Sequence, residues 1–77
     1  MNKLRIEAQA DRALEVIIEP GPCIFSVEKN HLIEIPLSGN ISDLTFSIHS
    51  DSLIVWESSS ILNLDEVQIS PKYMPDW

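Results

Sequence analysis

Residues 43–57 read DLTFSIHSDSLIVWE and contain two extended segments joined by one turn. In the first segment Leu44, Phe46 and Ile48 alternate with polar residues, which places all three on one face of a half-buried β-strand. The turn is centred on Asp51, and the second segment, residues 53–57, is apolar at four successive positions. Such an apolar run predicts a central strand, or one that is covered on both faces.

Period-two alternation also occurs at residues 14–19, 23–28, 31–37 and 66–69. Turn-forming residues separate these segments, at residues 20–22, 28–30, 38–40, 50–52, 58–60 and 70–71. Short strands at such regular spacing predict an all-β fold, a small antiparallel sandwich or open barrel of six to seven short strands.

The first segment fits two kinds of structure. Leu4, Ile6, Ala8 and Ala10 alternate with polar residues, as a strand requires, yet the segment is also rich in strong helix formers. A helical face through Leu4 and Ala8 meets Asp11 next, so the alternation favours a strand. We expect residues 1–70 to form a single β domain and residues 71–77, which contain two prolines, to form an extended tail.

The charge of the chain is strongly acidic and unevenly spread, with a formal net charge of −7 at pH 7. Residues 1–12 carry three basic and two acidic side chains, a net of +1, whereas residues 13–77 carry two basic and ten acidic side chains, a net of −8. An acidic body repels phosphate backbones and anionic membranes, so we expect neither nucleic acid nor membrane as a partner. It favours rapid encounter with a basic protein.

Cys23 is the single cysteine of the sequence, so no disulfide can form within the chain. No run of 18 apolar residues is present, and the first residues lack the apolar segment of a signal peptide. Small secreted domains usually need disulfides, so the sequence predicts a cytoplasmic protein.

The strings LEVIIEP at residues 14–20, FSVEKNHLIEIPLSG at 25–39 and LTFSIHSDSLIVWE at 44–57 resemble a group of short uncharacterised bacterial all-β proteins. In that group a strand ending in Glu-Pro leads to a hairpin and to a strand ending before Gly. The matching positions are Leu14, Val16, Glu19, Pro20, Phe25, Ile33, Ile35 and Gly39, and Gly21 stands where many relatives have an aromatic residue. The resemblance implies a small β fold and no known activity. The strand rhythm is also similar to half of a cupin-type jelly roll, but the metal-binding histidine pattern of cupins is missing.

No arrangement of reactive residues is typical of an active site. Cys23 with His31 or His49 could form a nucleophilic pair or contribute to a metal site, but nothing in the spacing requires these residues to converge. Glu15 and Glu19 lie on one strand face about 13 Å apart, too far for a glycosidase pair. We therefore expect no catalytic, cofactor or metal site, and we interpret Cys23 as a small buried hydrophobe.

An excess of apolar residues on the predicted outer faces is the more informative feature. Ile17 lies between Glu15 and Glu19, Ile24 and Leu32 interrupt the polar faces of their strands, and one of the pair Ile54 and Trp56 must also point outward. Together they predict an apolar protein-binding patch rimmed by carboxylates, anchored by Trp56. The alternative is that both faces are covered within the monomer. The predicted site residues are Ile17, Ile24, Leu32, Ile54, Trp56, Glu15 and Glu19.

These features predict a non-enzymatic, acidic protein-binding module, with an immunity- or antitoxin-like role against a basic partner as one concrete form. A self-assembling, homo-oligomeric accessory protein of a bacterial gene cluster, using the same patch on itself, is the alternative. A minimal enzyme or metal binder is a remote third.

Overall fold

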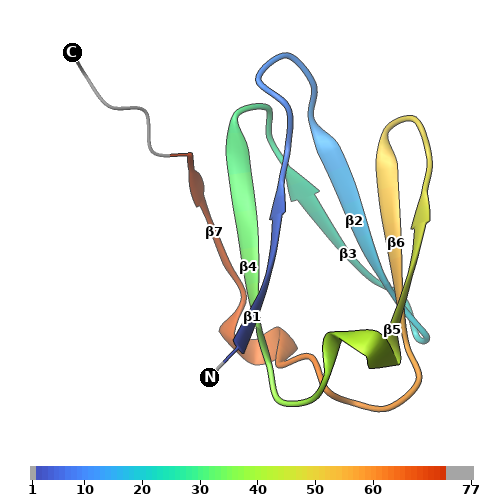
Figure 1. The fold of residues 1–77 in the computed structure, drawn as a ribbon. Helices are drawn as coiled ribbons and strands as arrows, with labels where there is room; N and C mark the ends of the chain where they lie inside the picture. The colour runs from blue at the N-terminus through green and yellow to red at the C-terminus, as the bar shows by residue number, and fades with distance from the viewer. Residues whose placement is uncertain (1, 73–77) are drawn as a thin grey trace.

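The computed structural model describes residues 2–72, which form an all-β fold (Figure 1). Within this range the chain has seven strands and two short 3-10 turns, and no helix long and apolar enough to cross a membrane. The elements are β1 (Asn2–Glu7), β2 (Leu14–Glu19), β3 (Cys23–Val27), β4 (His31–Leu37), η1 (Ile41–Asp43), β5 (Leu44–Ile48), β6 (Ser52–Glu57), η2 (Leu64–Glu66) and β7 (Gln68–Pro71).

The strands form two separate sheets, so the small all-β fold expected from the sequence is confirmed as a sandwich. One sheet has three strands in the order β1-β4-β7, and the other has four in the order β3-β2-β6-β5. Figure 1 shows the two sheets standing opposite each other, joined at the lower end by the segments that contain η1 and η2. The sheets do not close into a barrel.

One strand pair departs from the antiparallel arrangement expected throughout. β2 pairs with β6 in parallel, with Ile17 opposite Ile54, whereas the other four strand pairs are antiparallel. β2 forms a hairpin with β3 on one side, and β6 forms a hairpin with β5. The second hairpin then packs beside β2 with β6 running in the same direction, so the two hairpins make one sheet.

The core lies between the sheets and is made mainly of the residues that alternate inward from both, with Ala8, Ile61 and Leu62 added from the connecting segments. Its buried members are Leu4, Ala8, Val16, Ile18, Val27, Ile33, Ile35, Leu37, Leu44, Val55, Ile61 and Leu62. No polar or charged side chain of residues 2–72 is buried. Alternation therefore assigns the inward face correctly for β2 and β4, whose predicted bounds are also confirmed.

The C-terminal strand begins two residues later than predicted. Residues 64–66 form η2, and the Asn63 side chain caps this turn by accepting a hydrogen bond from the Asp65 N–H at 3.2 Å. β7 consequently runs Gln68–Pro71 and pairs with β4, with Ile69 opposite Ile33. Pro71 belongs to this strand rather than to the expected tail, of which residues 73–77 lie outside the described residues.

The lower end of the sandwich is closed by residues 58–63, which run beside the end of β4. Ser38 donates its N–H to the Ile61 carbonyl at 2.8 Å, and Asn63 donates its N–H to the Pro36 carbonyl at 2.9 Å. These two bonds hold the buried side chain of Ile61 against Gly39. A Cβ atom on Gly39 would lie 2.7 Å from Ile61 Cγ2, closer than packed carbon atoms approach.

Replacing Gly39 with Ala is therefore expected to lower the free energy of unfolding by about 2 kcal/mol, because the bonded backbone prevents the loop from moving away. Urea unfolding of Gly39→Ala, Ile61→Ala and the double variant measures this cost. The losses should fall short of additive in the double variant, since Ile61→Ala removes the clashing methyl group. Additive losses would show that Gly39 is needed for some other reason.

Candidate protein-binding surface

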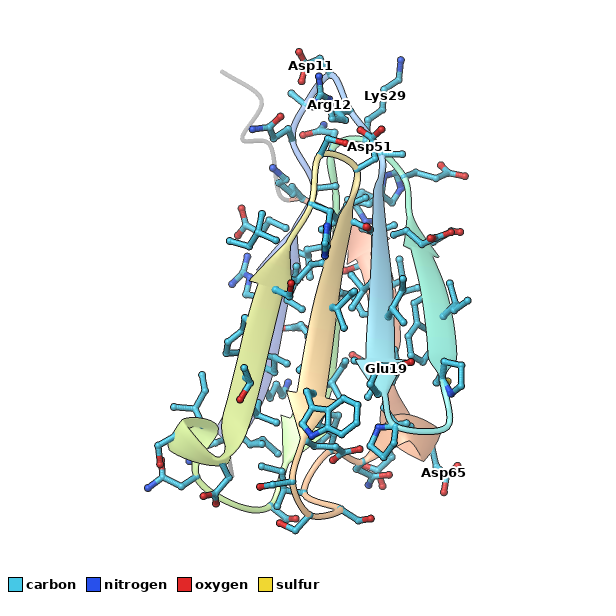
Figure 2. The ribbon with its side chains drawn as sticks, turned by 90° about the vertical axis from the view of Figure 1, so that its right-hand side faces the viewer. Asp11, Arg12, Glu19, Lys29, Asp51 and Asp65 are labelled. Atoms are coloured by element: carbon cyan, nitrogen blue, oxygen red, sulfur yellow. The ribbon has the colours of Figure 1, made fainter. Side chains whose placement is uncertain are left out.

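The outer face of the four-stranded sheet carries a row of apolar side chains that crosses three strands. Ile17 on β2 lies opposite Ile24 on β3 and opposite Ile54 on β6, so the three isoleucines are lateral neighbours. Ile24 is 57% exposed, and Ile17 and Ile54 are half-buried. Figure 2 looks onto this face, with β5, β6, β2 and β3 side by side. The three-stranded sheet packs on the opposite face, so residues 2–72 leave this row uncovered.

Trp56 and the two predicted glutamates border the isoleucine row. Trp56 lies opposite Glu19, next to the row along the strands, and its side chain is 47% exposed. Glu15 lies opposite Ser52 on the other side of the row. Figure 2 shows Glu19 at the lower end of β2 on this face. We call Ile17, Ile24, Ile54, Trp56, Glu15 and Glu19 the outer-face patch. The structure thus brings together six of the seven residues predicted for the site.

Leu32 is the predicted site residue that the structure separates from the others. It lies on β4, in the three-stranded sheet, and is only 5% exposed. β4 is the central strand of that sheet, and the neighbours of Leu32 are Glu7 on β1 and Ser70 on β7. The expectation that Leu32 joins the patch is therefore wrong. Alternation indicated its face correctly but could not indicate which sheet its strand would enter.

The charges on the outer-face patch are all of one sign. Its strands place Glu15 and Glu19 outward, and none of their outward positions is a Lys or Arg. Lys3 and Arg5 lie on β1 in the other sheet, and Lys72 lies 3.7 Å from a carboxylate oxygen of Glu7. These three cations lie away from the patch, and Arg12, which lines a hollow together with Glu15 at the upper end, is paired with Asp51. The patch strands themselves contribute an apolar centre with an anionic border.

The upper end of the sandwich is polar and gathers turns from both sheets. Figure 2 shows Asp11, Arg12, Lys29 and Asp51 together at this end. Arg12 Nε lies 3.8 Å from an Asp51 carboxylate oxygen, which links the β1–β2 turn to the β5–β6 turn. Both side chains are largely exposed, so the pair contributes little stability.

The residues considered for nucleophilic or metal chemistry do not meet. Cys23 begins β3 and is half-buried against the core, whereas His31 begins β4, beyond the turn at the far end of β3. The ring nitrogens of His31 and His49 lie within hydrogen-bond distance of local groups, the Lys29 carbonyl and the Ser47 hydroxyl. Within residues 2–72 no group of three or more His, Cys, Asp or Glu side chains lies close enough to hold a metal ion.

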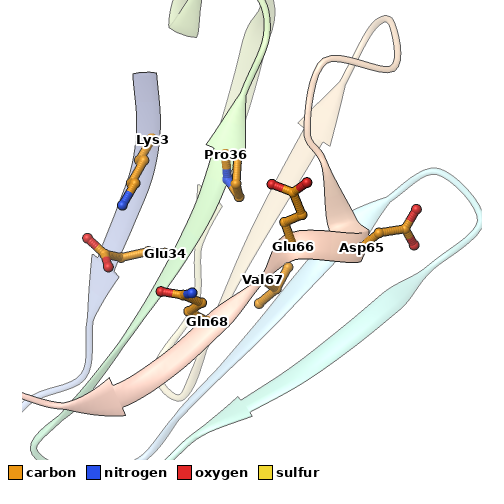
Figure 3. Close-up of a pocket in the computed structure, with 7 residues that line it drawn as sticks. All are labelled: Lys3, Glu34, Pro36, Asp65, Glu66, Val67 and Gln68. Carbon is orange, nitrogen blue, oxygen red and sulfur yellow. The ribbon is translucent and has the colours of Figure 1, made fainter. Parts of the chain in front are cut away.

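A shallow hollow of about 470 Å³ lies on the outer side of the three-stranded sheet (Figure 3). Lys3, Glu34, Asp65 and Glu66 line it with Pro36, Val67 and Gln68. Figure 3 shows Lys3 and Glu34 on neighbouring strands, with Asp65 pointing away from them. One amine among separated carboxylates does not make a defined acid–base pair, so the outer-face patch is the stronger candidate site.

The edge at β5 is a second exposed apolar feature of residues 2–72. Alternation predicted that Phe46 and Ile48 share one face, but it did not predict that this face is exposed. Phe46 and Ile48 lie opposite the core-facing Val55 and Leu53, so both point toward the core side of the sheet. They are nevertheless 41% and 83% exposed, because the facing sheet has three strands and does not extend over β5. The only signal in the sequence is that LTFSI contains no charged residue.

No family model, no curated protein and no solved structure matches this chain. The resemblance to short bacterial all-β proteins therefore stays a prediction, and the function has to be inferred from the surface itself.

Proposed function

We propose that this chain is a non-enzymatic protein-binding module that uses the outer-face patch to hold a partner with a basic surface. The observation that carries the proposal is the uninterrupted isoleucine row across β3, β2 and β6, with Trp56 beside it. An apolar centre with a polar border is the usual anatomy of a protein interface, and tryptophan is enriched among residues that dominate binding energy.

Charge supports a different protein, rather than a second copy, as the occupant of this patch. Two copies pressed face to face would oppose the Glu15 and Glu19 borders without any cation from these strands to neutralise them. A partner with Lys or Arg around an apolar centre satisfies both parts of the surface. A basic protein that acts on nucleic acid, with this chain as its immunity or antitoxin protein, is one concrete form of the proposal.

The test is capture of a partner by the tagged full chain, followed by titration of the purified partner by calorimetry. Trp56→Ala is expected to weaken binding about 30-fold, or about 2 kcal/mol, because the anchor side chain is lost. Ile69→Ala serves as the matched control, since Ile69 is a comparably exposed apolar residue on the other sheet. The association rate should fall as salt is raised.

Two results would contradict the proposal. One is a captured protein that lacks a basic surface, and the other is a partner that binds wild type and Trp56→Ala equally well. Equal weakening by Ile69→Ala and Trp56→Ala would likewise show that the loss is not specific to the outer-face patch.

A further inference from the structure

The four sheet edges of the sandwich differ in how well they are protected against pairing with another chain. β1 carries Lys3, Arg5 and Glu7, and β7 ends in Pro71, and both charge and proline discourage strand addition. β3 and β5 carry no charged residue. The inward side chains of β3 are buried or half-buried, whereas those of β5 at positions 46 and 48 are exposed. β5 is therefore the least protected of the four edges that residues 2–72 form.

The backbone of β5 offers hydrogen-bonding groups on this free side. The His49 N–H donates to the Ser52 carbonyl at 2.8 Å, and the Asp43 carbonyl accepts from the Ser58 N–H at 3.5 Å. The backbone N–H and C=O groups of the odd-numbered residues of β5 are therefore directed toward β6. Because backbone hydrogen bonding alternates along an antiparallel strand, the N–H and C=O groups of Leu44, Phe46 and Ile48 are directed away from β6. The Leu44 N–H donates to the Ile41 carbonyl within η1. Among residues 2–72 the Leu44 carbonyl and both backbone groups of Phe46 and Ile48 have no strand beside them.

We propose that β5 pairs antiparallel with β5 of a second copy of this chain, so that the two four-stranded sheets become one continuous sheet. The strand is self-complementary about Phe46. With Phe46 opposite Phe46 of the second copy, Ile48 lies opposite Leu44, and Thr45 lies opposite Ser47. Apolar residues then meet on the core side and hydroxyl residues meet on the outer side.

Hydrogen bonding and charge select this register over its neighbours. The two Phe46 residues exchange both of their backbone bonds, and each Ile48 N–H donates to the Leu44 carbonyl of the other copy. Asp43 then lies opposite His49, and no two like charges face each other. A shift that places Phe46 opposite Ile48 would set Asp43 opposite Asp51 at both ends, which is unfavourable. The opposite shift, which places Phe46 opposite Leu44, forms fewer hydrogen bonds with the solvent-directed backbone groups.

The two-fold axis of this dimer runs perpendicular to the sheet, since an antiparallel pair within one sheet has that symmetry. Both copies consequently present their outer-face patches on the same side. If the proposed function holds, the dimer is a bivalent surface and binds a partner with repeated sites more tightly than the monomer does. The pairing of β5 itself does not depend on that function.

Sedimentation velocity of the full chain over a concentration series tests the pairing. The interface is small, so we expect a dimer with a dissociation constant between about a micromolar and a millimolar. Ile48→Pro removes the solvent-directed N–H and an apolar contact, and it should weaken dimerisation roughly tenfold. Trp56→Ala should leave sedimentation unchanged, which separates this test from that of the proposed function.

Ser26→Pro is the matched control for the proline substitution. The Glu15 N–H on β2 is directed toward β6 and donates to the Asp51 carbonyl at 3.0 Å. The backbone groups of the even-numbered residues of β2 therefore form the hydrogen bonds to β3. Ser26, opposite Glu15, therefore directs its N–H to solvent at the other edge of the same sheet. Ser26→Pro is expected to dimerise as wild type does.

Disulfide trapping checks the register. In a Cys23→Ser background, Phe46→Cys places two thiols on the two-fold axis, where Cα atoms of a bonded pair lie about 5.5 Å apart, within disulfide range. It should cross-link faster than Ile24→Cys at the β3 edge. Wild type that stays monomeric at millimolar concentration, equal effects of the two prolines, or equal cross-linking at the two edges would each overturn the proposal.

Discussion

Ile35→Ala is expected to remove about 4 kcal/mol from the free energy of unfolding, the largest loss among the substitutions considered. Ile35 lies at the middle of β4, opposite Leu4, and its side chain is fully buried between the sheets. Truncating it to Ala removes three carbon atoms from water-excluded packing and leaves a cavity that both sheets border. A domain of this length has only about 4 to 11 kcal/mol in total.

Urea unfolding, followed by tryptophan fluorescence, measures the loss. Ile35→Val keeps most of the side chain and should cost only about 1 kcal/mol. Ile41→Ala removes the same atoms from an exposed position in η1 and should change stability by less than about 0.5 kcal/mol. Similar losses for Ile35→Ala and Ile41→Ala would mean that the core is not where the structure places it.

Glu57→Ala is expected to cost about 3 kcal/mol, because one carboxylate oxygen holds the loop that closes the lower end of the sandwich. Glu57 Oε1 accepts hydrogen bonds from the N–H groups of Ile61 and Leu62, both at 3.1 Å. The Ile61 N–H also donates to the Ser59 carbonyl, so it keeps an acceptor in the variant. The Leu62 N–H has only the Glu57 carboxylate as its acceptor among the described residues, so it loses its partner. A buried N–H without an acceptor is costly, and bonds to a charged acceptor are the stronger kind.

Amide hydrogen exchange measured by NMR isolates this effect from a general loss of stability. In Glu57→Ala the amide of Leu62 should exchange much faster than the amides at the centres of β2 and β4. Glu57→Gln keeps an oxygen acceptor and should lose only about 1 kcal/mol. Glu28→Ala, at an exposed acid in the β3–β4 turn, should be nearly neutral. Unchanged protection of Leu62 in Glu57→Ala would show that another group holds the loop.

The strands could be predicted because the alternation of apolar and polar residues within each strand shows which residues lie on each of its two faces. β2 and β4 have the predicted bounds, and perfect alternation through Leu4 and Ile6 correctly favoured a strand at the N-terminus over a helix. The residues of the outer-face patch could be predicted for the same reason. Ile17 occupies a polar position of an otherwise alternating strand, and Trp56 belongs to a segment that is apolar on both faces, so both were candidates before any pairing was known.

Partnership between strands could not be predicted, because it depends on residues far away along the chain. Leu32 looks like Ile17 in the sequence, yet its strand is central in the other sheet. The exposure of Phe46 and Ile48 likewise follows from the unequal number of strands in the two sheets. The sequence of β5 does not indicate how many strands the facing sheet has.

The parallel pairing of β2 with β6 has a consequence for how the protein is made. Ile17 is a neighbour of Ile54 in the finished sheet, so a ribosome must synthesise the intervening segment before β2 has its second partner. Until Glu57 has left the exit tunnel, a nascent chain can hold only the β2–β3 hairpin of this sheet, with the backbone of β2 open on one side. Contacts between such distant segments form slowly, so this sheet is completed late in folding.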